Sequence, residues 1–290
     1  HSPIRTNLPK MCGIENSIGP FEQLYAYRAF YNRSAEDESA VKYKIYLLPA
    51  GKLGIGWVAA EEEFTDLLIG RFEPFDLEQA NTLADYFREA NPRFGKELLR
   101  GGQFVNIPLR QTLAVMVCDG YAAIGDSAFM TMPIIGSGIA NSLKAAKMLA
   151  ETILADKAGA FSAEILWGYQ VKYYSKIGAG LSQIACIKKL LLKITPEELD
   201  YCFAEGILTA QDFAFGSDNT SLVSMLKISP HEIKSRAQAL FKDEALLKKI
   251  IALGMQIGKV AAVIKLMPRK WDKKAVDNWS RKYRKLFVLE

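Results

Sequence analysis

Residues 120–150 read GYAAIGDSAFMTMPIIGSGIANSLKAAKMLA, and this stretch carries more structural information than any other part of the chain. Residues 121–124 are apolar enough to predict a short buried strand. Gly125 and Asp126 follow where a parallel strand would end, which is the edge at which open α/β sheets bind ligands. The stretch therefore predicts a nucleotide-type site in which Asp126 holds a ribose or ribitol hydroxyl.

The residues after this turn continue the pattern. Pro133 stiffens a loop, and Gly136 and Gly138 allow backbone N–H groups to approach a ligand closely. Small residues from Ile139 onward predict a helix, and the positive N-terminus of such a helix favours an electron-rich group. Strand, turn, loop and helix together favour a dinucleotide site over an ordinary strand–turn–helix.

This pattern resembles the second flavin-binding motif of FAD-dependent oxidoreductases of the p-hydroxybenzoate hydroxylase type, particularly their geranylgeranyl reductase-like branch. That motif runs G-D-A-A-x(n)-P-x-x-G-x-G-I-x-x-A, and Ser127-Ala128 stands here for the Ala pair. The resemblance implies that Asp126 binds the ribityl chain of FAD and that the loop 133–138 lies against the isoalloxazine ring. The FAD-binding residues that it implies are Arg5, Gly125, Asp126, Pro133, Gly136, Ser137, Gly138 and Ile139.

The opening residues, HSPIRTNL, resemble the family's middle fingerprint D-G-x-x-S-x-x-R-x-x-L, with Ser2, Arg5 and Leu8 at the matching spacing. A strand followed by G-x-G-x-x-G, the arrangement that cradles a pyrophosphate, is missing from the sequence. The family carries that element in its first third. We therefore expect this chain to be the remaining two-thirds of a longer flavoprotein, inactive alone and binding FAD weakly or not at all.

Aromatic and β-branched residues predict a run of antiparallel strands before the motif. The predicted strands are residues 21–32, 41–48, 53–58 and 64–69. We expect the first two to pair with each other. Residues 104–109 predict a further strand that lies at an edge or ends at Pro108, because proline cannot donate to a ladder.

Helical spacing occurs in residues 77–90 and in nearly everything after Phe161. Thr195-Pro-Glu-Glu and Ser229-Pro-His-Glu are helix-start signatures, in which a hydroxyl caps the helix and a glutamate reaches back. We predict an α+β fold, an α/β flavoprotein fragment with an antiparallel substrate-binding sheet and a C-terminal helical region. The predicted segments are 1–20 (end of an FAD-domain segment), 21–111 (sheet domain), 112–160 (FAD-binding segment) and 161–290 (helical region).

Geranylgeranyl reductases also carry a substrate-cavity signature, Y-x-W-x-F-P followed by G-x-G. Its counterpart here keeps Trp57 and Gly70, whereas the tyrosine is Ile55, the Phe-Pro pair is Ala59-Ala60 and the last glycine is Phe72. The substitutions preserve an apolar wall. We therefore expect Ile55, Trp57, Ala59 and Ala60 to line a cavity for a hydrophobic substrate of altered shape.

Acid–base and metal chemistry have few candidates. The histidines are His1 at the terminus and His231 in a helix cap, so no Ser/His/Asp or Cys/His relay can be assembled, and catalytic residues stay unassigned. The four cysteines are far apart in sequence, which argues against a disulfide framework and a metal site. We expect Cys12 and Cys118 to be inert buried side chains.

The chain has 50% hydrophobic and 24% charged residues, which is typical of a globular protein with a sizeable core. Its net charge of +5 is concentrated near the C-terminus, where Asp272 and Asp277 are the acidic residues between Lys248 and Lys285. Residues 250–267 are apolar but contain two lysines, so they make a poor membrane span. A core helix is the preferred interpretation, with peripheral contact to an anionic membrane as the alternative; the basic patch lacks a nucleic-acid-binding fold.

These patterns predict a cytoplasmic or membrane-associated FAD-dependent reductase that acts on a hydrophobic, isoprenoid or lipid-like substrate and takes electrons from NAD(P)H or another reductant. A flavin contributes the hydride chemistry, so scarce acid–base residues are tolerable. Three alternatives remain open: a flavin monooxygenase or halogenase, an electron-transfer flavoenzyme that delivers to quinone, and a non-catalytic lipid- or partner-binding domain.

Overall fold

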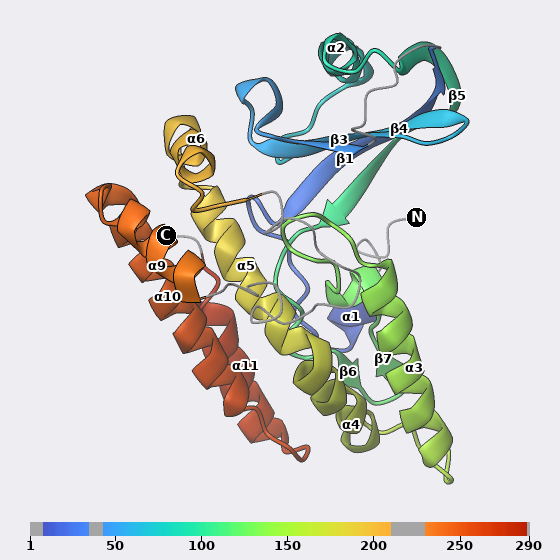
Figure 1. The fold of residues 1–290 in the computed structure, drawn as a ribbon. Helices are drawn as coiled ribbons and strands as arrows, with labels where there is room; N and C mark the ends of the chain where they lie inside the picture. Colours follow the sequence, from blue (N-terminus) through green and yellow to red (C-terminus); the bar gives the residue numbers. More distant parts are fainter. Residues whose placement is uncertain (1–7, 35–42, 210–229, 289–290) are drawn as a thin grey trace. The chain divides into compact units, whose positions relative to one another are not determined.

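The computed structural model describes residues 8–34, 43–209 and 230–288. The chain forms two compact units, of which one comprises residues 18–108 and the other the segments before and after it. The first unit is mainly a sheet and the second mainly helices (Figure 1). An α+β fold is therefore confirmed.

The sheet unit contains, among the described residues, five antiparallel strands in the order β2-β3-β4-β1-β5. Their bounds are β1 Gln23–Arg33, β2 Tyr43–Leu47, β3 Gly54–Ala60, β4 Phe64–Arg71 and β5 Phe94–Pro108. A 3-10 turn, η2 (Pro49–Gly51), follows β2, and the helix α2 (Leu77–Glu89) precedes β5. The predicted strands are all present, and the last one ends at Pro108 as expected.

The predicted pairing of the first two strands is wrong. β1 lies between β4 and β5, whereas β2 pairs with β3. The hairpin from β3 to β4 turns around Glu61, whose N–H donates to the Phe64 carbonyl at 2.9 Å. Tight turns make neighbours of consecutive strands, whereas the partner of β1 is selected by long-range packing that strand propensity does not encode.

One face of the sheet packs against α2. Asp76 caps this helix and Gln79 completes a capping box with it. Phe87 of α2 is fully buried and lies directly over Gly56, where a Cβ would approach the ring to 2.7 Å. Burying a phenylalanine side chain contributes roughly 1.5–3 kcal/mol. The cluster between helix and sheet contains Tyr27, Ala29, Tyr31, Val58, Leu67, Ile69, Ala80, Leu83, Ala84, Phe87 and Phe94.

The helical unit follows from residue 109 and includes the short N-terminal helix. Its elements are α1 Leu8–Met11, β6 Val117–Cys118, β7 Tyr121–Ala122, η3 Gly125–Ala128, α3 Ile139–Ala155, α4 Ala163–Tyr173, η4 Tyr174–Gly178, α5 Ala179–Leu191, α6 Pro196–Ala204, α9 Pro230–Leu240, α10 Glu244–Lys265 and α11 Lys273–Lys285. The α6 signature is confirmed, because Thr195 and Glu198 form a capping box. The second signature begins at Ser229, which lies outside the described residues.

A buried irregular segment, residues 109–116, runs through this unit. Its backbone groups bond to side chains of the surrounding helices, since a buried carbonyl must be satisfied somewhere. Gln170 of α4 does this twice, accepting from the Met116 N–H and donating to the Ala114 carbonyl, each at 2.7 Å. The other donors are Lys188 Nζ to Leu109 O (2.5 Å), Tyr174 Oη to Leu113 O (2.7 Å) and Tyr283 Oη to Thr112 O (3.1 Å).

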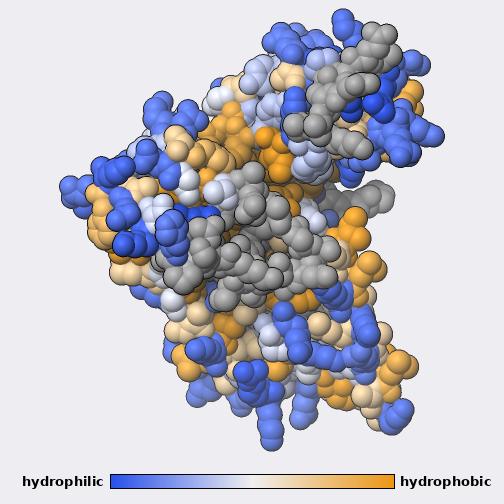
Figure 2. Space-filling view, viewed as in Figure 1, coloured by the Kyte–Doolittle hydropathy of each residue, from blue (hydrophilic) through white to orange (hydrophobic). Residues whose placement is uncertain are grey.

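The C-terminal helices expose both apolar and basic side chains. Ile251 and Met255 of α10 are exposed, with Lys248 and Lys259 nearby on the same helix. Hydrophilic and hydrophobic side chains are intermixed over the visible face of the helical unit (Figure 2). Among the described helices, none combines the length and apolarity that crossing a bilayer requires.

Candidate functional site

The Gly-Asp turn begins the candidate site. β7 pairs antiparallel with β6, and Ile124 is 36% exposed, so the predicted buried parallel strand at 121–124 is wrong. In the described part of the chain this strand pairs only with its hairpin partner. The chain then turns through η3, where Gly125 has a φ of +62° and the Met130 N–H returns to the Gly125 carbonyl at 3.1 Å.

Asp126 lies in the first turn of η3 and is half-buried. Its carboxylate has no hydrogen-bond or ion-pair partner among the described residues. Burial raises the pKa of Asp126 above its ordinary value, because desolvation penalises the charged form. A desolvated carboxylate without a protein partner is an acceptor that a ligand hydroxyl can satisfy.

The loop before α3, residues 132–137, is closed by its own backbone hydrogen bonds. The Met132 N–H donates to the Ser137 carbonyl at 2.8 Å, and the Gly136 N–H donates to the Met132 carbonyl at 2.9 Å. Gly136 has a φ of +72°, a conformation that favours glycine. Pro133 is buried and Ser137 is exposed. The loop therefore presents its Ser137 end outward and anchors its proline end.

Gly138 is the N-cap residue directly before α3 and has a packing role that the sequence did not reveal. A Cβ at Gly138 would lie 2.8 Å from Cγ2 of Thr131, so only glycine fits without movement of the loop. No side chain caps the helix there within the described residues. The first-turn N–H groups and the positive end of the helix dipole are therefore available to an electron-rich ligand. Ile139, directly after, is 80% exposed.

Two residues of the first turns of α3 join the loop to the Gly-Asp turn. Asn141 is buried and its Nδ2 donates to the Met130 carbonyl at 3.2 Å. Ser142 donates to the Gly138 carbonyl at 2.7 Å, and its Oγ would lie 3.4 Å from a Cβ at Gly125. The structure thus brings Gly125, Asp126, the loop and the α3 N-terminus together. Sequence reasoning missed Asn141 and Ser142, although polar residues at the start of a helix are a signal for such a role.

The remaining predicted residues lie elsewhere. Arg5 is outside the described residues. On β3 the strand alternation places Ile55, Trp57 and Ala59 on the face opposite α2, whereas Ala60 shares the α2 face with Val58. The four residues therefore do not form one wall. The cavity itself stays a prediction.

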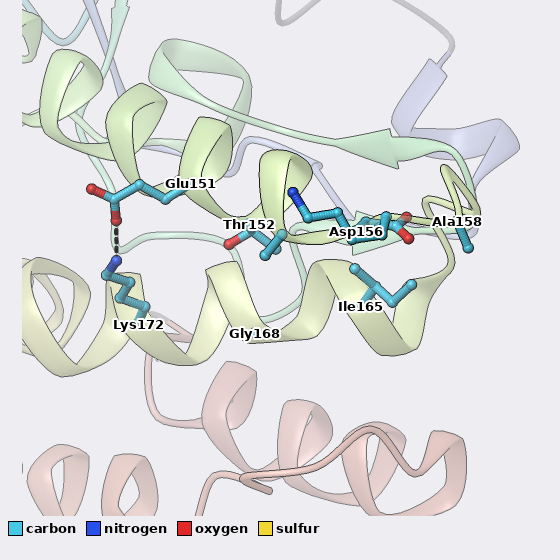
Figure 3. A pocket seen from close by; sticks show the side chains of 9 residues that line it. Glu151, Thr152, Asp156, Ala158, Ile165, Gly168 and Lys172 are labelled. Atoms are coloured by element: carbon cyan, nitrogen blue, oxygen red, sulfur yellow. Dashed lines mark hydrogen bonds and ion pairs between the residues drawn. The ribbon is translucent and has the colours of Figure 1, made fainter.

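A shallow pocket lies between the C-terminal half of α3 and α4 (Figure 3). Both acidic side chains in its lining have partners: Glu151 pairs with Lys172, and Asp156 accepts from the Phe161 N–H at 2.8 Å. Thr152 bonds to the Met148 carbonyl at 3.0 Å. This pocket contains no arrangement that suggests catalysis.

Conventional catalytic groups do not converge on the candidate site in the described residues. His231 is exposed on α9. The prediction that Cys12 and Cys118 are buried is wrong, because both are partly exposed and both line one cavity. The described residues of the candidate site therefore provide a carboxylate and backbone N–H groups.

Comparison with known proteins gives a consistent set of relatives, although no family model matches the chain. Digeranylgeranylglycerophospholipid reductase of Sulfolobus acidocaldarius is 26% identical over 187 residues, covering 64% of this chain and 40% of the relative. Digeranylgeranylglycerophospholipid reductase 2 of Methanococcoides burtonii is 23% identical over 264 residues, covering 86% and 59%. The chain thus spans about half the length of these curated relatives.

A solved structure has a similar fold. The geranylgeranyl bacteriochlorophyll reductase-like protein of Thermoplasma acidophilum superposes with a TM-score of 0.59 at 18% identity, covering 82% of this chain and 56% of that protein. At this identity the likeness shows the fold alone.

Proposed function

We propose that this chain belongs to the geranylgeranyl reductase-like flavoprotein family and is part of an FAD-dependent oxidoreductase. In this proposal it holds the ribityl side of FAD and supplies a substrate-binding sheet. The observation that carries the proposal is the Asp126 carboxylate, half-buried beside the uncapped N-terminus of α3. Desolvating such a group destabilises the fold unless a ligand bonds to it.

The residues present fit the cofactor. Asp126 would accept a hydrogen bond from a ribityl hydroxyl, which is a charge-assisted bond. The loop from Pro133 to Gly138 and the first turn of α3 would hold the electron-rich ring through backbone N–H groups. When bound, FAD supplies hydride transfer to or from the substrate. The protein residues position the two reactants and exclude water.

We further propose a hydrophobic, isoprenoid or lipid-like substrate and NAD(P)H or another reductant as its electron source. The names of the relatives support an isoprenoid class of substrate. On the sheet face opposite α2, Leu24, Ile55 and Leu68 are buried, Trp57 is partly exposed, and Arg28 and Asp66 form an ion pair. The proposed contact of the substrate is with this face beside Trp57. Apolar walls with few polar groups are the ordinary setting for such ligands.

The test is the FAD affinity of Asp126→Asn in the complete protein, measured by titrating FAD and following flavin fluorescence. The amide oxygen of asparagine still accepts a hydrogen bond but lacks the charge, so binding should weaken by about 1–1.5 kcal/mol, or roughly 5- to 10-fold. Asp200→Asn, at an exposed position of α6, is the matched control and should bind FAD like the wild type. An unchanged affinity for Asp126→Asn would show that this carboxylate does not hold the cofactor.

A further inference from the structure

We infer that Cys12 and Cys118 form a reversible dithiol–disulfide pair that closes the chain around the sheet unit. The two cysteines are far apart in sequence, yet both belong to the helical unit and both line the same cavity of about 330 Å³. The Cys12 and Cys118 side chains are close enough to share a hydrogen bond. Cys186 and Cys202, in contrast, are buried.

The backbone holds both thiols in place. Cys12 ends the turn of α1, where its N–H donates to the Leu8 carbonyl at 3.0 Å. Cys118 is paired with Tyr121 in the β6–β7 hairpin, and the Gly120 N–H at the hairpin turn donates to the Phe161 carbonyl at 2.8 Å. Bond formation therefore requires little loss of chain entropy, because the two residues are already positioned.

The cavity gives a small reactant access to the pair. Its lining includes acidic and basic side chains, among them Glu15, Asp119, Lys273 and Arg284. Such a mixed lining suits a polar molecule with several charges. Burial and the neighbouring thiol raise the pKa of Cys118 to about 12 while both thiols are reduced. A mixed disulfide at Cys12 removes that neighbouring thiol, so Cys118 acts in the second step.

The oxidant that we propose is a low-molecular-weight disulfide, R–S–S–R. Cys12 sulfur attacks one of its sulfurs, and the first R–SH leaves with a proton. Cys118 sulfur then attacks Cys12 in the mixed disulfide, and the second R–SH leaves. One external disulfide is reduced to two thiols while the two protein thiols are oxidised to one disulfide.

The proposed disulfide would join the two segments that flank the sheet unit. Residues 18–108 lie between the two cysteines and form the sheet unit. The segments at its two ends also meet at Arg110, whose guanidinium donates to the Ser17 carbonyl. A Cys12–Cys118 disulfide would fix both segments covalently, and the Gly-Asp turn begins only a few residues after Cys118.

The experiment incubates the folded chain with oxidised glutathione and maps disulfides by mass spectrometry without reduction. We expect a Cys12–Cys118 linked peptide, with two of the four thiols lost and Cys186 and Cys202 still titratable after unfolding. The melting temperature should rise by on the order of 5–10 °C and return on adding dithiothreitol, since a bond closing a long loop stabilises strongly.

Cys12→Ser and Cys118→Ser are the controls, and neither should show the rise in melting temperature on oxidation. The inference is overturned if wild-type protein that is folded by circular dichroism keeps four titratable thiols, or if only mixed disulfides, other pairs or linked dimers form. Because the primary measurement uses the unaltered chain, a variant that fails to fold leaves the disulfide map of the wild type unaffected.

Discussion

Asp126 has a carboxylate whose environment opposes its charge. It is half-buried, and burial is the sole cause of its raised pKa. A protonated Asp126 therefore contributes stability that is present at low pH and is lost as the pH rises through the folded-state pKa. If Asp126 binds the cofactor as proposed, this loss of stability in the ligand-free fold is a cost of that function.

Asp126→Asn should therefore become more stable relative to the wild type as the pH rises from about 4 to 7, because asparagine removes the buried charge and keeps the shape. Urea denaturation at several pH values in the absence of flavin measures this difference. Asp200→Asn on α6 controls for the exchange at an exposed position. If the two variants show the same pH dependence, desolvation of Asp126 has no effect on stability.

At the scale of the element, β3 shows how alternation divides neighbouring residues between two environments. Ala59 pairs with Tyr43 and Asp66 on the face opposite α2, while Ala60 pairs with Thr65 on the α2 face. Thr65 is fully buried and its hydroxyl bonds to the Arg93 carbonyl at 3.3 Å. Ala59 is buried and Ala60 is partly exposed, so a larger side chain at either position also tests the packing of the sheet.

Ala59→Phe should raise KM for the hydrophobic substrate or abolish turnover in the complete protein, with flavin content unchanged, because the larger ring occupies the proposed substrate face. Ala59→Phe and Ala60→Phe should both lower stability by about 1–3 kcal/mol through overpacking, so the effect on KM is what distinguishes Ala59 from Ala60. Steady-state kinetics and urea denaturation of both variants give the comparison. Unaltered kinetics for Ala59→Phe would remove this face from the substrate site.

At the scale of the whole molecule, the helical unit is organised around a segment that has no strand neighbour in the described residues. Four carbonyls of this segment accept hydrogen bonds from α5, α11, η4 and α4; they belong to Leu109, Thr112, Leu113 and Ala114, respectively. Burial raises the pKa of Tyr283 to about 12, so this tyrosine remains a donor throughout the neutral range. Helices distant in sequence thus share one buried polar framework, which specifies their packing.

Gln170→Ala should lower the free energy of unfolding by about 2–5 kcal/mol, because the Met116 N–H and the Ala114 carbonyl would both lose their buried partner. Gln103→Ala, at an exposed position of β5, should change it by less than about 0.5 kcal/mol. Thermal and urea denaturation of the two variants measure the contrast. A small loss for Gln170→Ala would mean that water replaces the side chain.

The sequence by itself determined the local structure around the candidate site. Helix α3 begins at Ile139 as predicted, α6 begins after its Thr195 cap, and β5 ends at Pro108. Such boundaries depend on interactions within a few residues, such as a capping hydroxyl or a missing N–H. Interactions of this range can be predicted from the sequence.

Only the tertiary structure decided which distant residues meet. It paired β2 with β3 rather than β1, brought Cys12 beside Cys118, and joined Asn141 and Ser142 to the Gly-Asp turn. Those outcomes depend on packing and on the satisfaction of buried polar groups across long loops. Spacing along the chain does not encode such contacts, because many folds would satisfy the same local preferences.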